Sequence, residues 1–271
     1  WFGWVGVEIF FTLSGFVIVF SAKKASAAKF AVGRLTRLFP TIWLCATLTL
    51  LLTLVLSPKF DPGELMQSYL NTLWMNPKGG HIDIVYWTLT VEIAFYFLVF
   101  VLLYLRDFSF LLKALLVVGA VSALFNTALF FSDAICHLSP ALAEVLQKIN
   151  GMHTFRLLLV KHGVFFAIGA LLWRRSIVDC SAGTDAMLIL LCVGASLEVW
   201  SEGTSHARHL GAPTASVAIV LGIWLLGLFS IGFGSTDRVT RWINACLPSG
   251  LVRQLGLLTF PLYLLHNNGG L

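Results

Sequence analysis

Long apolar stretches with very few charged residues recur along the whole chain. The stretch 84–105 reads IVYWTLTVEIAFYFLVFVLLYL, and Glu92 is its one charged residue. A helix needs about 20 apolar residues to cross the hydrocarbon core of a bilayer, where only helices and closed barrels satisfy the backbone. Charged residues make up 11% of the chain, against about 25% in a soluble domain. The sequence therefore predicts an all-α polytopic membrane protein.

We expect about eight membrane-spanning helices from the length of the apolar stretches. They cover residues 4–21, 39–57, 84–105, 108–131, 157–173, 185–200, 213–231 and 253–271. The connections between successive spans lie in turn on one side of the membrane and on the other. The connections on one side hold twelve of the 18 basic residues, and those on the other side hold six. By the positive-inside rule the richer set, which includes Lys23 and Arg106, faces the cytoplasm.

With this orientation the first span begins outside and the last span ends outside. One further helix at each end would return both termini to the cytoplasm and give about ten helices in the whole protein. The sequence also begins on WFGWVG without a Met and ends on HNNGGL directly after an apolar run. We therefore expect residues 1–271 to be a single membrane-embedded domain that is truncated at the N-terminus and at the C-terminus.

Two long connections, 58–83 and 132–156, lie on the predicted outer side. Their prolines lead us to expect loops there. These prolines are Pro58, Pro62, Pro77 and Pro140. Contacts with an outer substrate would come from these two connections.

Three ionisable residues lie at a similar depth within the predicted spans. At a rise of 1.5 Å per residue, Glu8, Glu92 and His266 lie about 20 to 22 Å from the cytoplasmic ends of their helices. An ionisable group at membrane depth is costly, which makes each one a candidate for function. Glu92 is the strongest candidate, because Thr88 and Tyr96 share its helical face at a spacing of four residues. The alternative for each is a structural hydrogen bond or contact with lipid headgroups.

Other polar residues are better explained by structure than by function. His162, beside Lys161, suits the membrane interface, and Glu198 is expected to reach the headgroups. His206 and His209 are expected in a solvated loop without a third metal ligand. The five cysteines are scattered and form no CxxC pair, which argues against a zinc ribbon or a disulfide framework. We therefore expect no metal site.

The basic segment KFAVGRLTRLFP, residues 29–40, holds two arginines three residues apart. On a helix Arg34 and Arg37 share one face, and two guanidinium groups suit a phosphate or pyrophosphate ligand. The alternative is an anchor at anionic lipid headgroups, and the spacing does not decide between them. No GxGxxG, Walker or HExxH motif is present, so nucleotide-driven transport and zincin chemistry have no support.

Five segments of the sequence, in order, resemble the motifs of one family. These are GVEIFFTLSGFVI (6–18), FAVGRLTRLFP (30–40), WTLTVEIAFY (87–96), the weaker FFAIGALLWRR (165–175) and FPLYLLHNN (260–268). They are similar to the GV-x-x-FF-x-x-SGF, F-x-x-x-R-x-x-R-L-x-P, W-S-L-x-x-E-x-x-F-Y, F-x-x-G-x-x-L and Y-x-L-Y-L-x-H blocks of acyltransferase family 3. Thr88 stands where the third block has Ser. The resemblance extends over nearly the whole chain.

The resemblance implies a membrane O-acyltransferase. Such an enzyme moves an acyl group, usually acetyl, from acyl-CoA at the cytoplasmic face to a sugar hydroxyl of a glycan at the outer face. Acyl-CoA is then a donor substrate, and no permanently bound cofactor is expected. The expected partners are acyl-CoA, a glycan or sugar acceptor and the lipid bilayer, with no nucleic acid. The expected location is the bacterial inner membrane.

The resemblance also gives roles to individual residues. Arg34 and Arg37 become candidates for binding the CoA phosphates. Glu92 becomes a candidate for positioning or deprotonating a catalytic histidine or the acceptor hydroxyl, with Glu8 and His266 as further catalytic candidates. The residues expected to line the acceptor path are Trp87, Tyr96 and Tyr263.

One departure from the family pattern and one alternative function remain open. The catalytic histidine of the family is expected in a helix before the first motif, so we expect the given sequence to lack it. The alternative function is a transporter or flippase of a glycan or lipid-linked precursor that uses buried acids as a proton relay. Inverted repeats with broken helices would favour transport, and the sequence shows none. The sequence does not reveal the acceptor sugar, the acyl chain or the route of the acyl group.

Overall fold

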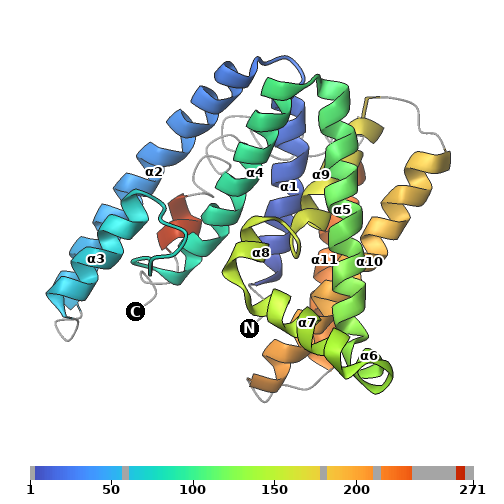
Figure 1. Cartoon of the computed structure of the whole chain (residues 1–271). Coiled ribbons are helices and arrows are strands. Elements are labelled where there is room, and N and C mark those ends of the chain that lie inside the picture. Colours follow the sequence, from blue (N-terminus) through green and yellow to red (C-terminus); the bar gives the residue numbers. More distant parts are fainter. Residues whose placement is uncertain (1–3, 57–60, 178–181, 210–214, 234–260, 266–271) are drawn as a thin grey trace, which may run out of the picture. The chain divides into compact units, whose positions relative to one another are not determined.

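The computed structural model describes residues 4–56, 61–177, 182–209, 215–233 and 261–265 (Figure 1). All regular elements in these ranges are helices. Five described helices are long and apolar enough to cross a membrane: Val5–Ala22, Ala27–Leu56, Ile84–Leu105, Phe108–Phe130 and Ala182–His209. The all-α membrane fold is therefore confirmed, whereas the expected count of about eight spans is not.

The chain divides into two compact units. The first unit combines Trp1–Ala27 with Leu98–Asp237, and the second combines Ala28–Phe97 with Arg238–Leu271. Each unit therefore joins segments that are far apart in the sequence.

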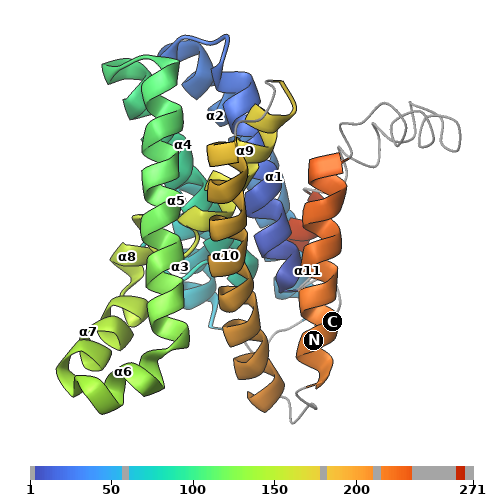
Figure 2. The ribbon, with the colours of Figure 1, turned by 90° about the vertical axis from the view of Figure 1, so that its right-hand side faces the viewer.

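The first unit is a helical bundle around the short helix α9 (Figures 1 and 2). Its helices are α1 (Val5–Ala22), α5 (Phe108–Phe130), α9 (Gly163–Arg175), α10 (Ala182–His209) and α11 (Ala215–Phe233). Helix α9 contacts α1, α5 and α10, and every residue from Gly163 to Trp173 is buried. A helix that is apolar on all sides belongs inside such a bundle.

The expected span 157–173 is wrong in its extent, because α9 begins at Gly163 and has 13 residues. At 1.5 Å per residue it is about 20 Å long, which is shorter than the hydrocarbon core of about 30 Å. Before it come the short helix α8 (His153–Leu157) and a turn over 158–162. The apolar stretch therefore contains a bend that places polar residues of the turn inside the bundle.

Two glycines allow α1 and α9 to approach each other closely. A Cβ atom on Gly15 would overlap the main chain of Phe166, and one on Gly169 would overlap the main chain of Thr12 and Phe16. Small residues at helix crossings are typical of membrane bundles, where close backbone packing replaces the hydrophobic effect as the driving force. Glycine is therefore required at both positions of this crossing.

The connections expected to be loops contain helices. The segment 132–156 forms α6 (Ser132–Leu138), α7 (Pro140–Gly151) and part of α8, and the segment 58–83 contains α3 (Pro62–Leu73). The expectation is wrong because Pro140 and Pro62 occupy the first turn of a helix, where the missing N–H costs nothing. The Asp61 carboxylate caps α3 by accepting a hydrogen bond from the Gly63 amide at 3.3 Å.

The second unit is built on α2 (Ala27–Leu56), α3, the 3₁₀ turn η1 (Ile84–Tyr86) and the start of α4 (Trp87–Leu105). The Trp43 indole donates to the Leu73 carbonyl at 3.1 Å, and the hydroxyl groups of Thr47 and Tyr69 lie 3.0 Å apart, so α2 and α3 lie side by side. Helix α2 continues through Pro40. The expected span 39–57 and the basic segment before it are therefore one helix.

Two further expectations concern the C-terminal half. Helix α10 extends to His209, so His206 and His209 lie on a helix and the expected loop is wrong. The His206 ring stacks on Trp4 with 5.1 Å between ring centroids. The expected span 253–271 lies outside the described residues apart from 261–265.

The glycine crossing gives a direct test of the fold. Gly169→Ala is expected to lower the free energy of unfolding by about 1–3 kcal/mol, because the added methyl group overlaps backbone atoms of α1. The control is Gly222→Ala on α11, where a Cβ would meet nothing within 4 Å. Chemical denaturation of the purified protein in detergent measures both changes. Equal stability of the two variants would contradict the close crossing.

Candidate functional site

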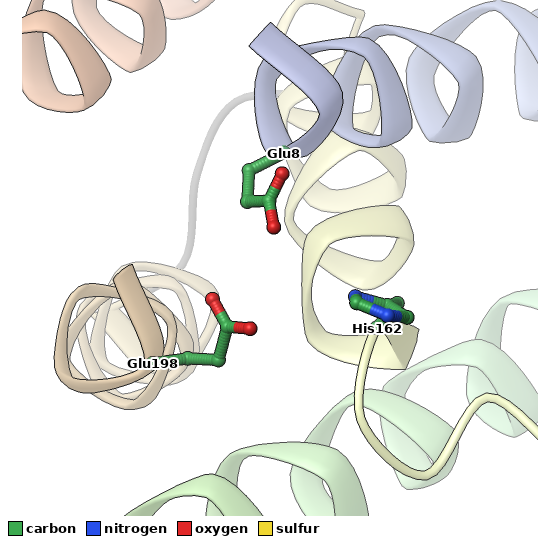
Figure 3. Close-up of side chains that lie close together, drawn as sticks. All are labelled: Glu8, His162 and Glu198. Carbon is green, nitrogen blue, oxygen red and sulfur yellow. The ribbon is translucent and has the colours of Figure 1, made fainter. Parts of the chain in front are cut away.

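Three ionisable side chains meet in the interior of the first unit (Figure 3). Glu8 comes from α1, His162 from the residue before α9 and Glu198 from α10. Their exposed fractions are 4%, 3% and 3%. One carboxylate oxygen or ring nitrogen from each lies within 4.8 Å of the others.

The buried face of α1 positions Glu8 in this cluster. Glu8, Phe11, Gly15 and Ile18 are all buried and follow one another at spacings of three and four residues, so they share a helical face. The ring of His162 packs on Phe11 with 5.3 Å between centroids. The glycine crossing that brings α1 onto α9 therefore also brings Glu8 toward His162.

The turn before α9 is held by polar side chains of α5. The Ser122 hydroxyl and the Asn126 amide both donate to the Lys161 carbonyl, at 2.8 and 3.0 Å. Within the turn Leu159 has a φ of 61°, a left-handed backbone that is rare for a branched side chain. Strained backbone of this kind persists where the surrounding contacts fix it, and it clusters at functional sites. The turn thus presents Lys161 and His162 to the bundle interior.

The cluster and its charged neighbours, Lys161 and Glu202, contain more carboxylates than cations. The Lys161 ammonium donates to Glu202 and lies 3.7 Å from the nearer oxygen of Glu198, which is beyond hydrogen-bond distance. Among the described residues, Oε2 of Glu8 and both carboxylate oxygens of Glu198 have no hydrogen-bond partner. Buried carboxylates are normally paired or coordinated, so this arrangement indicates a site for a proton or a cation.

Two interpretations of these residues from the sequence are wrong. Glu198 does not reach the headgroups but lies buried beside Lys161, because α10 turns this side chain toward the bundle. His162 is not at an interface, because the turn directs its ring inward against Phe11. Sequence reasoning also gave no role to Lys161 or Glu202. Two features of the sequence could have indicated such a role. Glu198 and Glu202 are four residues apart and so share one helical face, and Lys161 lies within the preceding apolar stretch.

A polar cavity of about 510 Å³ adjoins this cluster. It lies between the C-terminal ends of α5 and α10 and the helices α6 and α7, and Lys161, Glu198 and Glu202 are among its lining residues. Other lining side chains are Asn126, Gln147, Asn150, Trp200 and Ser201. Its volume falls in the range of small-molecule sites, roughly 300–1,000 Å³.

The second unit holds a separate polar group around Glu92. The Tyr96 hydroxyl donates to Oε1 of Glu92 at 2.6 Å, and Glu92 is 5% exposed. The guanidinium carbon of Arg34 lies 5.5 Å from the centre of the Phe30 ring and 5.9 Å from that of Tyr96. This distance suits a cation–π contact. The structure thus brings Arg34, Tyr96 and Glu92 together.

The remaining predicted residues lie as follows. Arg37 is exposed on α2, and Trp87 is half-buried at the start of α4. Thr88 does not bond to Glu92, because its hydroxyl donates to the Val85 carbonyl at 2.9 Å and lies 3.1 Å from the Tyr263 hydroxyl. His266 lies outside the described residues. The similar membrane depth of His266, Glu8 and Glu92 stays a prediction.

Comparison with known proteins bears on the chemistry of these groups. No curated protein and no solved structure matches the chain. The family model described as "Acyltransferase domain" (acyltransferase 3) matches residues 2–268. Because this match covers essentially the whole chain, the protein belongs to the acyltransferase 3 family of membrane acyltransferases.

Proposed function

We propose that this protein is an O-acyltransferase of the bacterial inner membrane. It takes an acetyl group from acyl-CoA on the cytoplasmic side and transfers it to a sugar hydroxyl of a glycan on the outer side. The observation that carries the proposal is the polar cavity of the first unit, which adjoins the buried cluster of Glu8, His162 and Glu198. Family membership favours acyl transfer over the alternative of a transporter or flippase.

The chemistry of the cavity lining supports a sugar acceptor. The side chains of Asn126, Gln147 and Asn150 offer both donors and acceptors, and hydroxyl groups of a sugar need both. Trp200 adds an aromatic surface to the lining. The cavity lies between α5, α6, α7 and α10 near the segment 132–156, which the distribution of basic residues assigns to the outer side.

The arginine pair of α2 supports a CoA donor. Arg34 and Arg37 lie on the segment that the positive-inside rule assigns to the cytoplasmic side. Their guanidinium groups match the geometry and charge of phosphate groups. The contacts of Arg34 with Phe30 and Tyr96 fix the direction of its side chain, which lowers the entropy lost on binding.

The reaction requires one proton transfer at the acceptor. The hydroxyl oxygen forms a bond to the acyl carbonyl carbon, the carbon–sulfur bond to CoA breaks, and the hydroxyl proton passes to a base. A positioned base contributes roughly 10²–10⁴-fold to the rate. Glu8, Glu92 and His266 are the proposed acid–base residues. Glu92, held by Tyr96, would position a histidine or take this proton itself.

The charge of Glu92 can be tested apart from its hydrogen bond. Gln at this position still accepts a hydrogen bond from Tyr96 but has no negative charge. Glu92→Gln is therefore expected to reduce acceptor acylation by about 10²-fold or more, in line with the loss of a general base. The measurement is the initial rate of acylation in membranes that contain the full-length protein, with wild type and variants at matched expression. The control is Glu64→Gln on the exposed surface of α3. Unchanged acylation in Glu92→Gln would exclude the proposed role.

The acceptor cavity predicts a specific kinetic change. Trp200→Ala is expected to raise the KM for the glycan acceptor about tenfold, about 1.4 kcal/mol of binding, while the KM for acyl-CoA stays the same. The matched control is Trp74→Ala, since Trp74 lies in the second unit and is 80% exposed. Initial rates with one substrate varied at a time separate the two constants. The cavity is not the acceptor site if both variants show the same acceptor KM.

Substitutions in the proposed donor site are expected to change the KM for acyl-CoA and not the KM for the acceptor. Arg34→Gln is expected to raise the KM for acyl-CoA about tenfold or more, because a hydrogen bond to a charged group contributes roughly 1.5–3 kcal/mol. Arg106→Gln is the control, because Arg106 is exposed on the same predicted side of the membrane. Steady-state kinetics at saturating acceptor measure the constant. Equal effects of both substitutions would indicate a lipid anchor in place of a donor site.

A further inference from the structure

We propose that Glu8, His162 and Glu198 bind one divalent cation of the zinc class. The sequence predicted no metal site, because the three residues lie on separate segments that only the fold brings together. The inference concerns the buried cluster alone and does not depend on the identity of the acyl donor or acceptor. With the ion bound, Glu8 would serve as its ligand and would leave the proton transfer to Glu92 and His266.

The geometry of the cluster suits a small cation. Zinc binds histidine nitrogen and carboxylate oxygen at about 2.0–2.2 Å, which places tetrahedral ligand atoms about 3.4 Å apart. One donor atom from each of the three residues already lies within 4.8 Å of the others. Figure 3 shows the carboxylates of Glu8 and Glu198 directed toward each other, with the ring of His162 beside them. Small rotations of the two long Glu side chains would bring the donors into contact with one ion.

The charges of the cluster favour a divalent ion. Glu8, Glu198 and Glu202 bring three carboxylates, and Lys161 is the neighbouring cation that ion-pairs with two of them. Lys161 donates to Glu202, and among the described residues Oε2 of Glu8 and both oxygens of Glu198 have no hydrogen-bond partner. Two like charges this close in a medium of low dielectric repel strongly. An ion of charge +2 would offset both.

The donor set indicates the kind of ion. Mg²⁺ and Ca²⁺ prefer oxygen ligands, whereas imidazole nitrogen together with carboxylate oxygen suits Zn²⁺ and related transition metals. Three protein ligands leave one position of a tetrahedral zinc open. Glu198 also lines the polar cavity, so the open position would be reachable from there.

The competing explanation is a proton shared between Glu8 and Glu198. Two carboxyl groups close together often hold one proton, because both cannot ionise at once. That explanation predicts no metal, whereas a cation site predicts bound zinc that depends on all three residues. Metal content therefore decides between the two without any measurement of acyl transfer.

The test uses the protein purified in detergent, stripped with a chelator and reloaded with zinc. Elemental analysis after gel filtration is expected to find about one zinc per chain. Glu8→Gln, His162→Gln and Glu198→Gln are each expected to weaken zinc affinity by about tenfold or more, since even outer-shell changes cost 10- to 100-fold. Cobalt in place of zinc is expected to give visible absorption bands that shift in His162→Gln, where a nitrogen ligand is lost.

Glu144→Gln is the matched control, because Glu144 is exposed on α7 and lies in the same unit. This variant is expected to keep wild-type zinc content. Zinc is also expected to raise the melting temperature of the wild type and of Glu144→Gln, but not of Glu198→Gln. The absence of stoichiometric zinc from the wild type would overturn the proposal. Zinc that all three cluster variants retain would overturn it as well.

Discussion

The close crossing of α1 and α9 at Gly15 and Gly169 is the contact on which the first unit depends. Gly15 and Gly169 have no side chain, so at these two positions the main chains of the helices come into direct contact. In a bilayer the hydrophobic effect gives helices no reason to associate, and such backbone packing takes its place. The crossing brings the buried face of α1, with Glu8 two turns before Gly15, against the start of α9. A buried carboxylate and an imidazole are neighbours for this reason.

The crossing also places ionisable side chains inside the bundle. A bundle that buries Glu8, His162 and Glu198 must satisfy them inside, since lipid offers no hydrogen bonds. Lys161, held in a strained turn by Ser122 and Asn126, satisfies part of this demand. The carboxylate oxygens that Lys161 does not bond would need a proton or a cation. Glu198 also lines the polar cavity, so the cluster and the cavity share a side chain.

Sequence reasoning succeeded where the relevant spacing is local. The four-residue spacing on α4 predicted that Tyr96 and Glu92 share a face, and the structure shows a hydrogen bond between them. It failed where the fold brings distant segments together, as for His162 and Glu198. The bend before α9 was hidden in an apolar stretch, and Pro140 begins a helix that was expected to be a loop. Gly15 and Gly169 were recognised within motifs, but their shared crossing is a tertiary contact that no single helix pattern reveals.

The proposed transfer of an acyl group from CoA to a glycan can be measured directly. Sealed membrane vesicles that contain the protein can be supplied with acetyl-CoA labelled in the acetyl group on the cytoplasmic side, together with the surface glycan. We expect label to appear as an ester on the glycan and to be released as acetate by base, and we expect vesicles without the protein to show none. Label that remains entirely on CoA while the glycan crosses the membrane would contradict acyl transfer and favour a transporter.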